Sequence, residues 1–509
     1  MDDQRNLGAH AVCSFGNGRC RQWHGCRYVA FCKYCGIGEG MKLRKVKWQN
    51  HPVLRNLELD FTRDDGTAYD TVVLIGENGS GKTSVMESIG TFLNVGSFDE
   101  FEYLEFETNG NIYRALHRST NQPNATFFRL QDMATGTIND INVDRNFNHR
   151  HLETNTQDPR HYGCTISKAR ADYKTDKIKH VTTSNLDDNK YSTDNDDNFT
   201  SLKQMFVDIV SQDEHDYTMI NEGKSQEETI TVEQFRLKHS KQCRFVRAFD
   251  AFFADRGLKY GKVENRGGNK EILFEKGDNK IAVDSLSTGE KQIVYRGMFL
   301  LRNLNALSGS IVFVDEPELS MHPRWQKKIL PFYENLFKDG AGNRTSQMFF
   351  ATHSNYVVDS AFTDAANHLV ILLSSDANGV VTSHKVDNAD RVLPRISTAE
   401  INYLAFHLPS IEYHVELYGY LQIKEGNLVA GRAFNVKETD DFIKNRAQYD
   451  ARRHAKQYVF TKPNGDMTTY DTLCSYIRNC IDHPDPVAHT VPTEEEMKTS
   501  IELLRELCR

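Results

Sequence analysis

The chain has 509 residues, of which 39% are hydrophobic and 26% charged, and its formal net charge is −8 at pH 7. This length exceeds one compact core, so we expect two or three domains of a soluble, cytoplasmic protein. The acidic balance gives no overall basic surface for nucleic acid, so any such contact must be local. No uninterrupted apolar run is long enough to span a bilayer, and the N-terminus lacks the basic-then-apolar pattern of a signal peptide.

Residues 1–40 differ in composition from the rest of the chain. Half of the ten cysteines lie here, namely Cys13, Cys20, Cys26, Cys32 and Cys35. The C-x-x-C spacing of the last two suits a structural zinc ion, although a second C-x-x-C pair is absent. The alternative is that the folded chain begins at Met41, so that residues 1–40 are an unstructured extension or a wrongly assigned start.

A phosphate-binding pattern follows a predicted buried strand. The strand is Thr71 to Ile75, and the next eight residues, Gly76-Glu77-Asn78-Gly79-Ser80-Gly81-Lys82-Thr83, fit G-x-x-x-x-G-K-[ST]. Helical spacing of apolar residues begins directly afterwards. In this context the backbone N–H groups of the loop and the helix N-terminus bind phosphate, Lys82 reaches the β- and γ-phosphates, and Thr83 ligates Mg²⁺. We therefore predict ATP and Mg²⁺ as ligands.

The segment from about residue 101 to 260 is predicted to be an insertion into this nucleotide-binding domain. Phe101 to about Arg129 has the pattern of short strands, and the runs 139–161 and 184–198 are polar. From Phe199 to about Gly257 the apolar residues have helical spacing. Sustained heptads are absent, so we do not expect long coiled-coil arms.

Three further motifs complete the predicted α/β domain. Ser287 and Glu290 have the spacing of a capping box at the start of a helix. An apolar strand, Ile311 to Val314, ends in Asp315-Glu316, and another, Met348 to Thr352, ends in His353. Strands that deliver polar residues at their carboxyl ends predict a doubly wound sheet with its ligands beyond those ends.

Together these motifs resemble the ATP-binding-cassette ATPases of the SMC, RecF and OLD type. The residues that carry the resemblance are the phosphate loop, Leu286-Ser287-Thr288-Gly289-Glu290, Asp315 to Pro323, and Ala351 to Ser354. Their order and spacing agree with that group, and the domain is predicted to span residues 41–395. The LSTGE form of the signature and the D-E-P-E-x-x-x-H-P run favour this branch, which includes Septu and retron ATPases of bacterial antiphage defence, over transporters.

The resemblance implies a role for each motif. Asp315 would hold the Mg²⁺ shell with Thr83, Glu316 would orient and deprotonate the attacking water, and His353 would contact the γ-phosphate. The plainer alternatives are a structural carboxylate for Glu316 and a satisfied core histidine for His353. The family's glutamine loop is harder to place, and Gln131 is our candidate.

The resemblance also implies a homodimer, because the signature acts on nucleotide bound to a second subunit. Ser287 and Gly289 would cap the γ-phosphate held by the partner's phosphate loop. The residues expected to hold the nucleotide are therefore Gly76, Asn78, Gly79, Ser80, Gly81, Lys82, Thr83, Ser287 and Gly289.

Residues 396–509 are predicted to form an all-α module. Near its end, Arg478-Asn479-Cys480-Ile481-Asp482-His483 resembles the R-x4-H motif of HEPN ribonucleases, in which two chains pair to make one RNA-cleaving site. There His483 would act as general acid and base, and Arg478 would steady the phosphate. Five helical steps turn the two side chains about 140° apart, so one helix does not bring them together. The alternative is an interface helix in which Arg478 pairs with Asp482 at i, i+4.

Two functions follow from these motifs. The first is an ATP-driven dimer that cleaves RNA with its own C-terminal module, as an antiviral defence. The second is an ATPase subunit that regulates a separate HNH-type nuclease, with the C-terminal module as the docking platform, as in Septu pairs. Both functions predict that the assembly binds RNA or DNA. An SMC- or RecF-like DNA-repair ATPase is a further alternative, because fold alone does not decide function.

Overall fold

The structure is a computed structural model. It describes residues 40–170, 173–188, 191–193, 199–225, 228–339, 342–376, 378–386, 390–395, 397–461, 465–483 and 490–509. The five cysteines of the zinc prediction lie outside the described residues, so the zinc prediction is not addressed by the fold.

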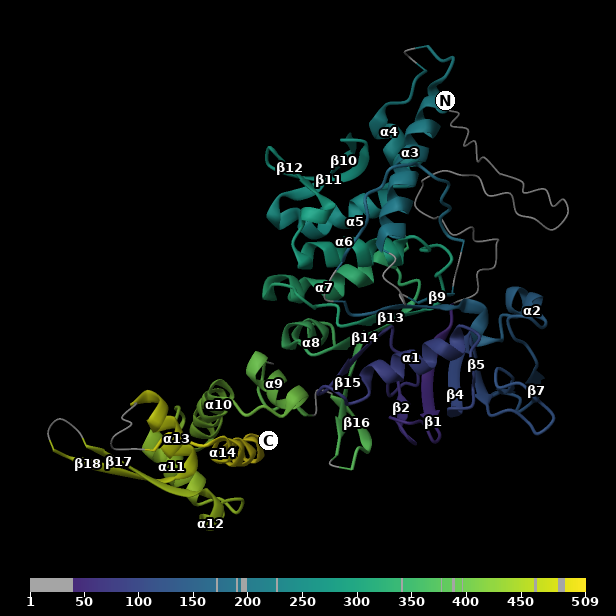
Figure 1. The fold of residues 1–509 in the computed structure, drawn as a ribbon. Coiled ribbons are helices and arrows are strands. Elements are labelled where there is room, and N and C mark those ends of the chain that lie inside the picture. Colours follow the sequence, from purple (N-terminus) through teal and green to yellow (C-terminus); the bar gives the residue numbers. More distant parts are fainter. Residues whose placement is uncertain are drawn as a thin grey trace, which may run out of the picture.

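A twisted, mainly parallel sheet forms the centre of the predicted ATPase domain (Figure 1). Among the described residues it has seven strands in the order β16-β15-β3-β14-β13-β8-β9, and only β16 runs antiparallel to its neighbour. The strands are β3 (Thr71–Ile75), β8 (Cys164–Ser167), β9 (Tyr191–Thr193), β13 (Ile311–Asp315), β14 (Gln347–Thr352), β15 (His368–Ser375) and β16 (Val381–Val386). The expected α/β fold is thereby confirmed, and strand β3, which lies between β15 and β14, leads into the phosphate loop.

Both faces of this sheet are buried, which explains why its strands are continuously apolar. Alternate residues of each strand belong to different cores: Val73 and Val312 face one core, whereas Val72 and Phe313 face the other. The strand registers place Asp315 beside Ala351 and Thr352 beside Ile75. The carboxyl ends of β3, β13 and β14 therefore share one edge of the sheet.

One face of the central sheet is covered by α1 (Lys82–Leu93) and by an antiparallel sheet. In the described chain this second sheet has the order β2-β1-β4-β5-β6-β7. Its strands are β1 (Lys42–Trp48), β2 (Glu58–Asp60), β4 (Phe101–Thr108), β5 (Asn111–Leu116), β6 (Phe128–Asp132) and β7 (Ile138–Ile141). Because β4 pairs directly with β1, the first part of the predicted insertion is integral to the domain.

The other face is covered by helices, as the apolar spacing after Phe199 predicts. This layer is built from α3 (Phe199–Asn221), α5 (Cys243–Phe253), α6 (Thr288–Leu301), α7 (Pro323–Leu336) and α8 (Asn355–Phe362). A small antiparallel sheet lies between α5 and α6 in the chain, with strands β10 (Leu258–Arg266), β11 (Asn269–Lys276) and β12 (Asn279–Ala282). Shorter elements are α2 (His149–Thr154), η1 (Pro159–Tyr162), α4 (Val232–Lys238), η2 (Ala254–Arg256) and η3 (Val283–Ser285).

The C-terminal module has its own core and lies beside the predicted ATPase domain (Figure 1). Its helices are α9 (Thr398–Phe406), α10 (Ile411–Ala430), α11 (Val436–Lys444), α12 (Ala451–His454), α13 (Leu473–Asp482) and α14 (Glu494–Cys508). The predicted helices are present, but the all-α assignment was wrong in one part. Residues Ala455–Thr461 (β17) and Met467–Thr472 (β18) form a hairpin, because Tyr458, Phe460 and Tyr470 pack on the helical core through alternating positions.

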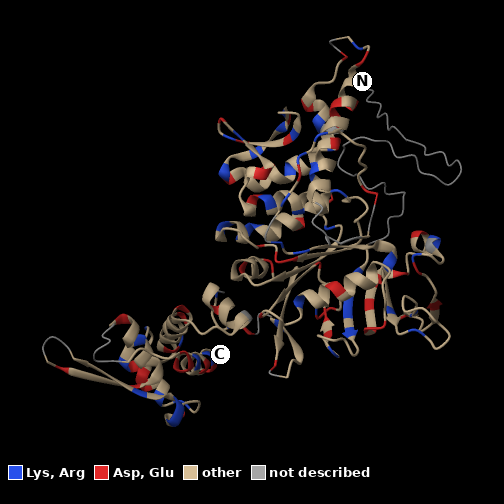
Figure 2. Ribbon diagram, in the orientation of Figure 1, with Lys and Arg blue, Asp and Glu red and all other residues tan. Residues whose placement is uncertain are grey.

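Helix α9 belongs to both bodies. Ile401 is fully buried in the core of the predicted ATPase domain, whereas Ala399 is buried in the core of the C-terminal module. Basic and acidic residues are mixed along most elements of the two bodies (Figure 2). In the described part of the chain, no helix combines the length and the apolar character that crossing a membrane requires.

Candidate active site

The phosphate loop folds as a tight cradle between β3 and α1. Gly76, Gly79 and Gly81 have φ angles of +144°, +81° and +94°, in the region that favours glycine. A Cβ at Gly76 would lie 2.1 Å from the carbonyl oxygen of Leu373, and one at Gly81 would lie 2.7 Å from Leu54 Cδ2. Nothing lies within 4 Å of the corresponding position at Gly79. The loop is therefore packed closely at Gly76 and Gly81 and open at Gly79.

Lys82 is directed into this cradle. Its Nζ donates to the carbonyl oxygens of Gly76 and Glu77, both at 2.9 Å, and the residue is only 6% exposed. Burial lowers the pKa of Lys82 to about 8, against the raising effect of the Asp315 and Glu316 carboxylates. The amine is held by two neutral carbonyl groups, so a phosphate chain in the loop would give it a stronger, charged acceptor.

Thr83 and Asp315 meet across the gap between α1 and β13. The Thr83 hydroxyl donates to Asp315 Oδ2 at 3.1 Å, and burial raises the pKa of the Asp315 carboxyl. Two hard oxygen donors beside a phosphate loop suit Mg²⁺, which uses few protein ligands and completes its shell with phosphate and water. Among the described residues, no three His, Cys, Asp or Glu side chains gather into a metal-holding group. The Thr83 hydroxyl and the Asp315 carboxylate fit a Mg²⁺ ion of that kind.

Glu316 follows Asp315 in an unusual backbone conformation. Its φ angle is +42°, which is uncommon for a residue with a side chain. Its N–H donates to the carbonyl oxygen of Ala351 at 2.8 Å, which joins the ends of β13 and β14. The carboxylate keeps 32% of its surface exposed and lies 3.7 Å from His353 Nε2. The carboxylate is therefore partly accessible at the carboxyl end of β13, beside His353.

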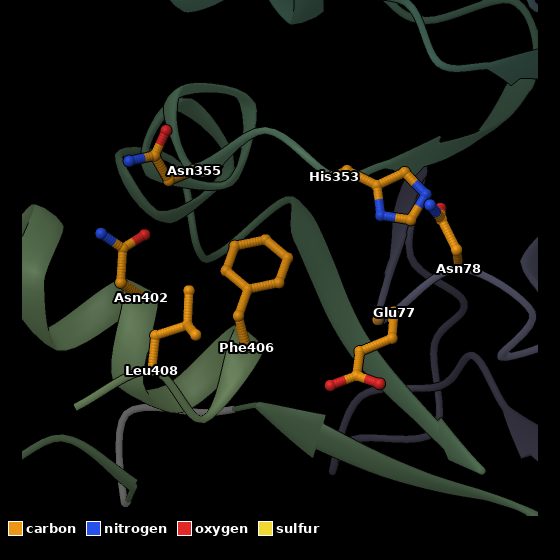
Figure 3. A pocket seen from close by; sticks show the side chains of 8 residues that line it. Glu77, Asn78, His353, Asn355, Asn402, Phe406 and Leu408 are labelled. Atoms are coloured by element: carbon orange, nitrogen blue, oxygen red, sulfur yellow. The ribbon is translucent and has the colours of Figure 1, made fainter. Parts of the chain in front are cut away.

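His353 is held at the end of β14 by a buried carboxyl group. Glu318 Oε1 accepts hydrogen bonds from the Thr352 hydroxyl at 2.7 Å and from the His353 N–H at 3.0 Å. Burial, reinforced by the Lys82 charge, lowers the pKa of His353, which favours the neutral imidazole. The ring is one-third exposed and points toward Asn78 of the phosphate loop (Figure 3). This half-open position does not match the satisfied core histidine of the alternative interpretation.

A cleft of about 480 Å³ opens beside the phosphate loop and His353 (Figure 3). One wall comes from the loop and the start of α8, and the opposite wall comes from α9 and the segment after it. The lining residues are Gly76, Glu77, Asn78, His353, Asn355, Asn402, Phe406 and Leu408. The C-terminal module thus supplies part of this cleft, which the sequence did not reveal because more than 300 residues separate the phosphate loop from α9.

The signature segment begins α6 with the predicted capping box. The Ser287 N–H donates to Glu290 Oε2 at 2.8 Å, and the Glu290 N–H donates to Ser287 Oγ at 3.4 Å. Ser287 and Thr288 are exposed, whereas Gly289 is buried against the turn after Glu316. The start of this helix is therefore on the surface, where a second chain could contact it.

Sequence reasoning assigned no role to three buried polar residues that organise this edge of the sheet: Gln292, Arg296 and Glu318. The first two lie on α6, and all three contact the segment from Asp315 to His353. The sequence signal that could have revealed Arg296 is its place in an apolar helix, close to Ile293, Val294 and Met298. Gln131, our candidate for the glutamine loop, lies within β6 and pairs with Arg114 and Ile138. It is in the antiparallel sheet, away from the strands that carry the phosphate-binding residues.

The R-x4-H residues engage different neighbours within one chain. Arg478 Nη2 lies 2.5 Å from Asp482 Oδ2, which is the ion pair of the alternative interpretation. His483 ends α13, and its ring stacks on Phe460 with 4.9 Å between the centroids. A shared Arg/His site thus stays a prediction about a pair of chains.

The central sheet, the glycine loop before α1 and the Asp315-Glu316 pair at the carboxyl end of β13 define an α/β P-loop nucleotide-binding protein. A family model described as "AAA domain, putative AbiEii toxin, Type IV TA system" matches residues 72–359, and the chain belongs to this family.

Curated proteins and solved structures give more distant similarities. The chain is 34% identical over 96 residues to the "Retron Ec83 probable ATPase" of Escherichia coli, and this match spans 17% of each chain. It is also similar to an SMC head bound to the C-winged helix domain of ScpA and to an SMC head domain from Thermotoga maritima. Both structures are 14% identical to this chain, and each match covers 68% of it. The two matches cover 98% and 99% of the respective SMC chains, with TM-scores of 0.36 and 0.33.

Proposed function

We propose that this chain is an ATP-hydrolysing switch that works as a homodimer and controls a toxic nuclease in bacterial defence. The observation that carries the ATPase part is the arrangement at one sheet edge: Lys82 in the cradle, Asp315 bonded to Thr83, and the Glu316 carboxylate beside His353. These groups supply charge neutralisation and a base for water, which phosphoryl transfer requires.

In the proposed reaction each residue has one task. Lys82 balances the charge of the β- and γ-phosphates, and the loop N–H groups orient them. Glu316 accepts the proton of the attacking water, because its carboxylate is exposed and at the end of the strand next to β14. His353, held neutral by its environment, donates a hydrogen bond to the γ-phosphate. Thr83 and Asp315 would hold Mg²⁺, which supplies positive charge to the phosphate oxygens.

The proposal of a homodimer rests on the exposed start of α6. Ser287 stands at a helix N-terminus, where backbone N–H groups and the helix dipole favour an anion. Among the described residues, the Ser287 N–H and hydroxyl donate to Glu290 Oε2, which closes the capping box. A partner's γ-phosphate would therefore be received by Ser287 and the N–H of Gly289.

The nuclease part of the proposal has two forms. In one, the C-terminal module cleaves RNA when two copies bring Arg478 and His483 together. In the other, the module docks a separate nuclease subunit, and this form is favoured by exposed apolar residues on α10, since Ile411, Val415 and Ile423 are 50%, 42% and 55% exposed. The ion pair of Arg478 with Asp482 also weakens the first form. The link to defence is supported by the family description and the partial match to a retron ATPase.

The decisive experiment is Glu316→Gln. Because the amide cannot accept the proton of water, turnover should fall by roughly 10²–10⁴-fold while ATP binding is retained. Light scattering should then find a nucleotide-trapped dimer. An unchanged turnover rate would remove Glu316 from its role, and a monomer at saturating ATP would end the dimer proposal. His483→Ala separates the two nuclease forms, because only the first predicts that RNA cleavage is lost while ATP turnover persists.

A further inference from the structure

One face of α6 lies on the turn that follows β13. Gly289, Gln292 and Arg296 are spaced three and four residues apart, so they share one side of the helix. A Cβ at Gly289 would lie 2.8 Å from the carbonyl oxygen of Ser320, which has a φ angle of +60°. Gln292 Nε2 lies 3.4 Å from the carbonyl oxygens of both Glu316 and Pro317. The helix that begins at the exposed Ser287 is therefore seated on the Glu316–Ser320 turn.

Arg296 makes the most extensive of these contacts. It is 1% exposed, and its guanidinium donates to the carbonyl oxygens of Glu316 at 3.0 Å, of Ser167 at 3.2 Å, and of Asp315. A buried charge is unfavourable unless its donors are satisfied, and the carbonyl groups at the carboxyl ends of β8 and β13 satisfy several of them. The guanidinium thus ties together two strand ends and the residue proposed as the base.

The contact matters because Glu316 adopts a left-handed backbone conformation. Such a conformation persists in a residue with a side chain only when the surroundings hold it. The N–H of Glu316 is bonded to Ala351, and its carbonyl oxygen is bonded to Arg296 and Gln292. The direction of the carboxylate, 3.7 Å from His353, therefore depends on α6.

We infer that Arg296, assisted by Gln292, is a positioning residue that couples the start of α6 to the Glu316 carboxylate of the same chain. Engagement of Ser287 by a partner's nucleotide displaces α6 as a unit, and Arg296 transmits that displacement to the backbone of Glu316. Each protomer then activates its own base only when it also caps the nucleotide of its partner. The two sites of the dimer accordingly hydrolyse ATP cooperatively. This inference rests on the function proposed above and adds how its two sites are regulated.

A purely structural role for Arg296 makes a different prediction. In that case substitution would lower the unfolding midpoint, and turnover would fall only in proportion to the fraction of folded protein. Positioning instead predicts a selective loss of kcat in folded protein, because a carboxylate moved by about 1 Å can lose roughly 10²-fold in rate.

The experiment uses Arg296→Lys, which keeps the charge but loses the fork of donors, and Gln292→Met, which keeps the volume but loses the amide. Both should be made in the full chain, with Arg302→Lys as the matched control. Arg302 lies at the other end of α6 and stacks on Phe299, remote from Glu316 in the helix. ATP turnover, nucleotide affinity, thermal unfolding and the Hill coefficient should be measured for each variant.

We expect Arg296→Lys to lower kcat by roughly 10- to 100-fold, and Gln292→Met by a few-fold, with ATP affinity near that of the wild type. The Hill coefficient for ATP should fall toward 1 in both, while Arg302→Lys should leave both quantities unchanged. Normal kcat and cooperativity in folded Arg296→Lys would overturn the inference. If that variant does not fold, Gln292→Met decides, and a normal kcat there would overturn it. Glu316→Gln in parallel separates the two levels: an active Glu316→Gln defeats the proposed function, whereas an inactive one beside a fully active Arg296→Lys defeats only the coupling.

Discussion

The two edges of the central sheet both carry buried polar residues, but they differ in how these are satisfied. At the amino edge, Glu334 Oε1 accepts from the Thr71 hydroxyl at 2.7 Å and lies 2.7 Å from His368 Nε2 and 2.9 Å from Arg344 Nη2. This group is closed, since Glu334 and His368 are 6% and 7% exposed. The charges of this group are paired and its hydrogen bonds are made within the fold, which indicates a structural role.

The carboxyl edge is open by comparison. Glu316 and His353 keep about one-third of their side-chain surface exposed. Among the described residues, the Lys82 amine donates to neutral acceptors, namely the carbonyl oxygens of Gly76 and Glu77 and the Ser80 hydroxyl. The comparison teaches that burial alone does not distinguish a functional polar cluster from a structural one. The distinguishing feature of a functional cluster is that its charged and hydrogen-bonding groups remain available to bind a ligand.

The largest expected effect is at the closed edge. Glu334→Gln removes the negative charge that Arg344 and His368 surround, so the free energy of unfolding should fall by about 3–5 kcal/mol. Urea unfolding measures this directly. ATP turnover, assayed where the variant is still folded, should remain near that of the wild type, and a loss of turnover in folded protein would contradict the contrast between the edges.

The converse effect is expected at the open edge. Lys82→Ala removes the cation that faces the phosphates, so turnover should fall by roughly 10²–10³-fold. The unfolding midpoint should not fall, because a desolvated ammonium group is removed from a buried position. Calorimetric unfolding beside an ATP-binding titration tests both parts, and normal ATP affinity would refute the assignment of this loop.

A dependence of stability on pH should come from the closed edge. Burial acts to raise the pKa of Glu334, but His368, Thr71 and Arg344 outweigh it and lower that pKa below the ordinary value of 4.5. A lowered pKa in the folded state contributes stability above pH 4.5, which is lost as the pH falls through the folded value. Urea unfolding between pH 7 and 3.5 should therefore show a decline that is shallower in Glu334→Gln, and equal slopes would contradict the prediction.

The smallest effect compares two glycines in helices. Gly289→Ala places a Cβ 2.8 Å from the Ser320 carbonyl oxygen and should lower turnover roughly tenfold by moving the turn after Glu316. Gly419 lies in α10 with nothing within 4 Å of its Cβ position, so Gly419→Ala should instead stabilise the protein by about 0.5–1 kcal/mol. Equal turnover in the two variants would show that the Gly289 contact is not transmitted to the site.

Much of the candidate site was readable in the sequence because its motifs are local. The phosphate loop is one strand–loop–helix unit, and the capping box at Ser287 spans four residues. The adjacency of Asp315, Glu316 and His353 followed from the rule that parallel strands end at a common edge. The hairpin β17–β18 was missed, because its alternating pattern is short and lies next to charged helical segments.

What the sequence determined by itself was the chemistry of each strand end, since glycine, lysine and carboxylate positions are set by local backbone geometry. Tertiary structure alone decided that α9 forms one wall of the cleft, that Glu318 accepts a hydrogen bond from the His353 N–H, and that Arg296 contacts the backbone of Glu316. These contacts join residues that are distant in the chain. They depend on the shapes and crossing angles of packed elements, for which no local pattern exists.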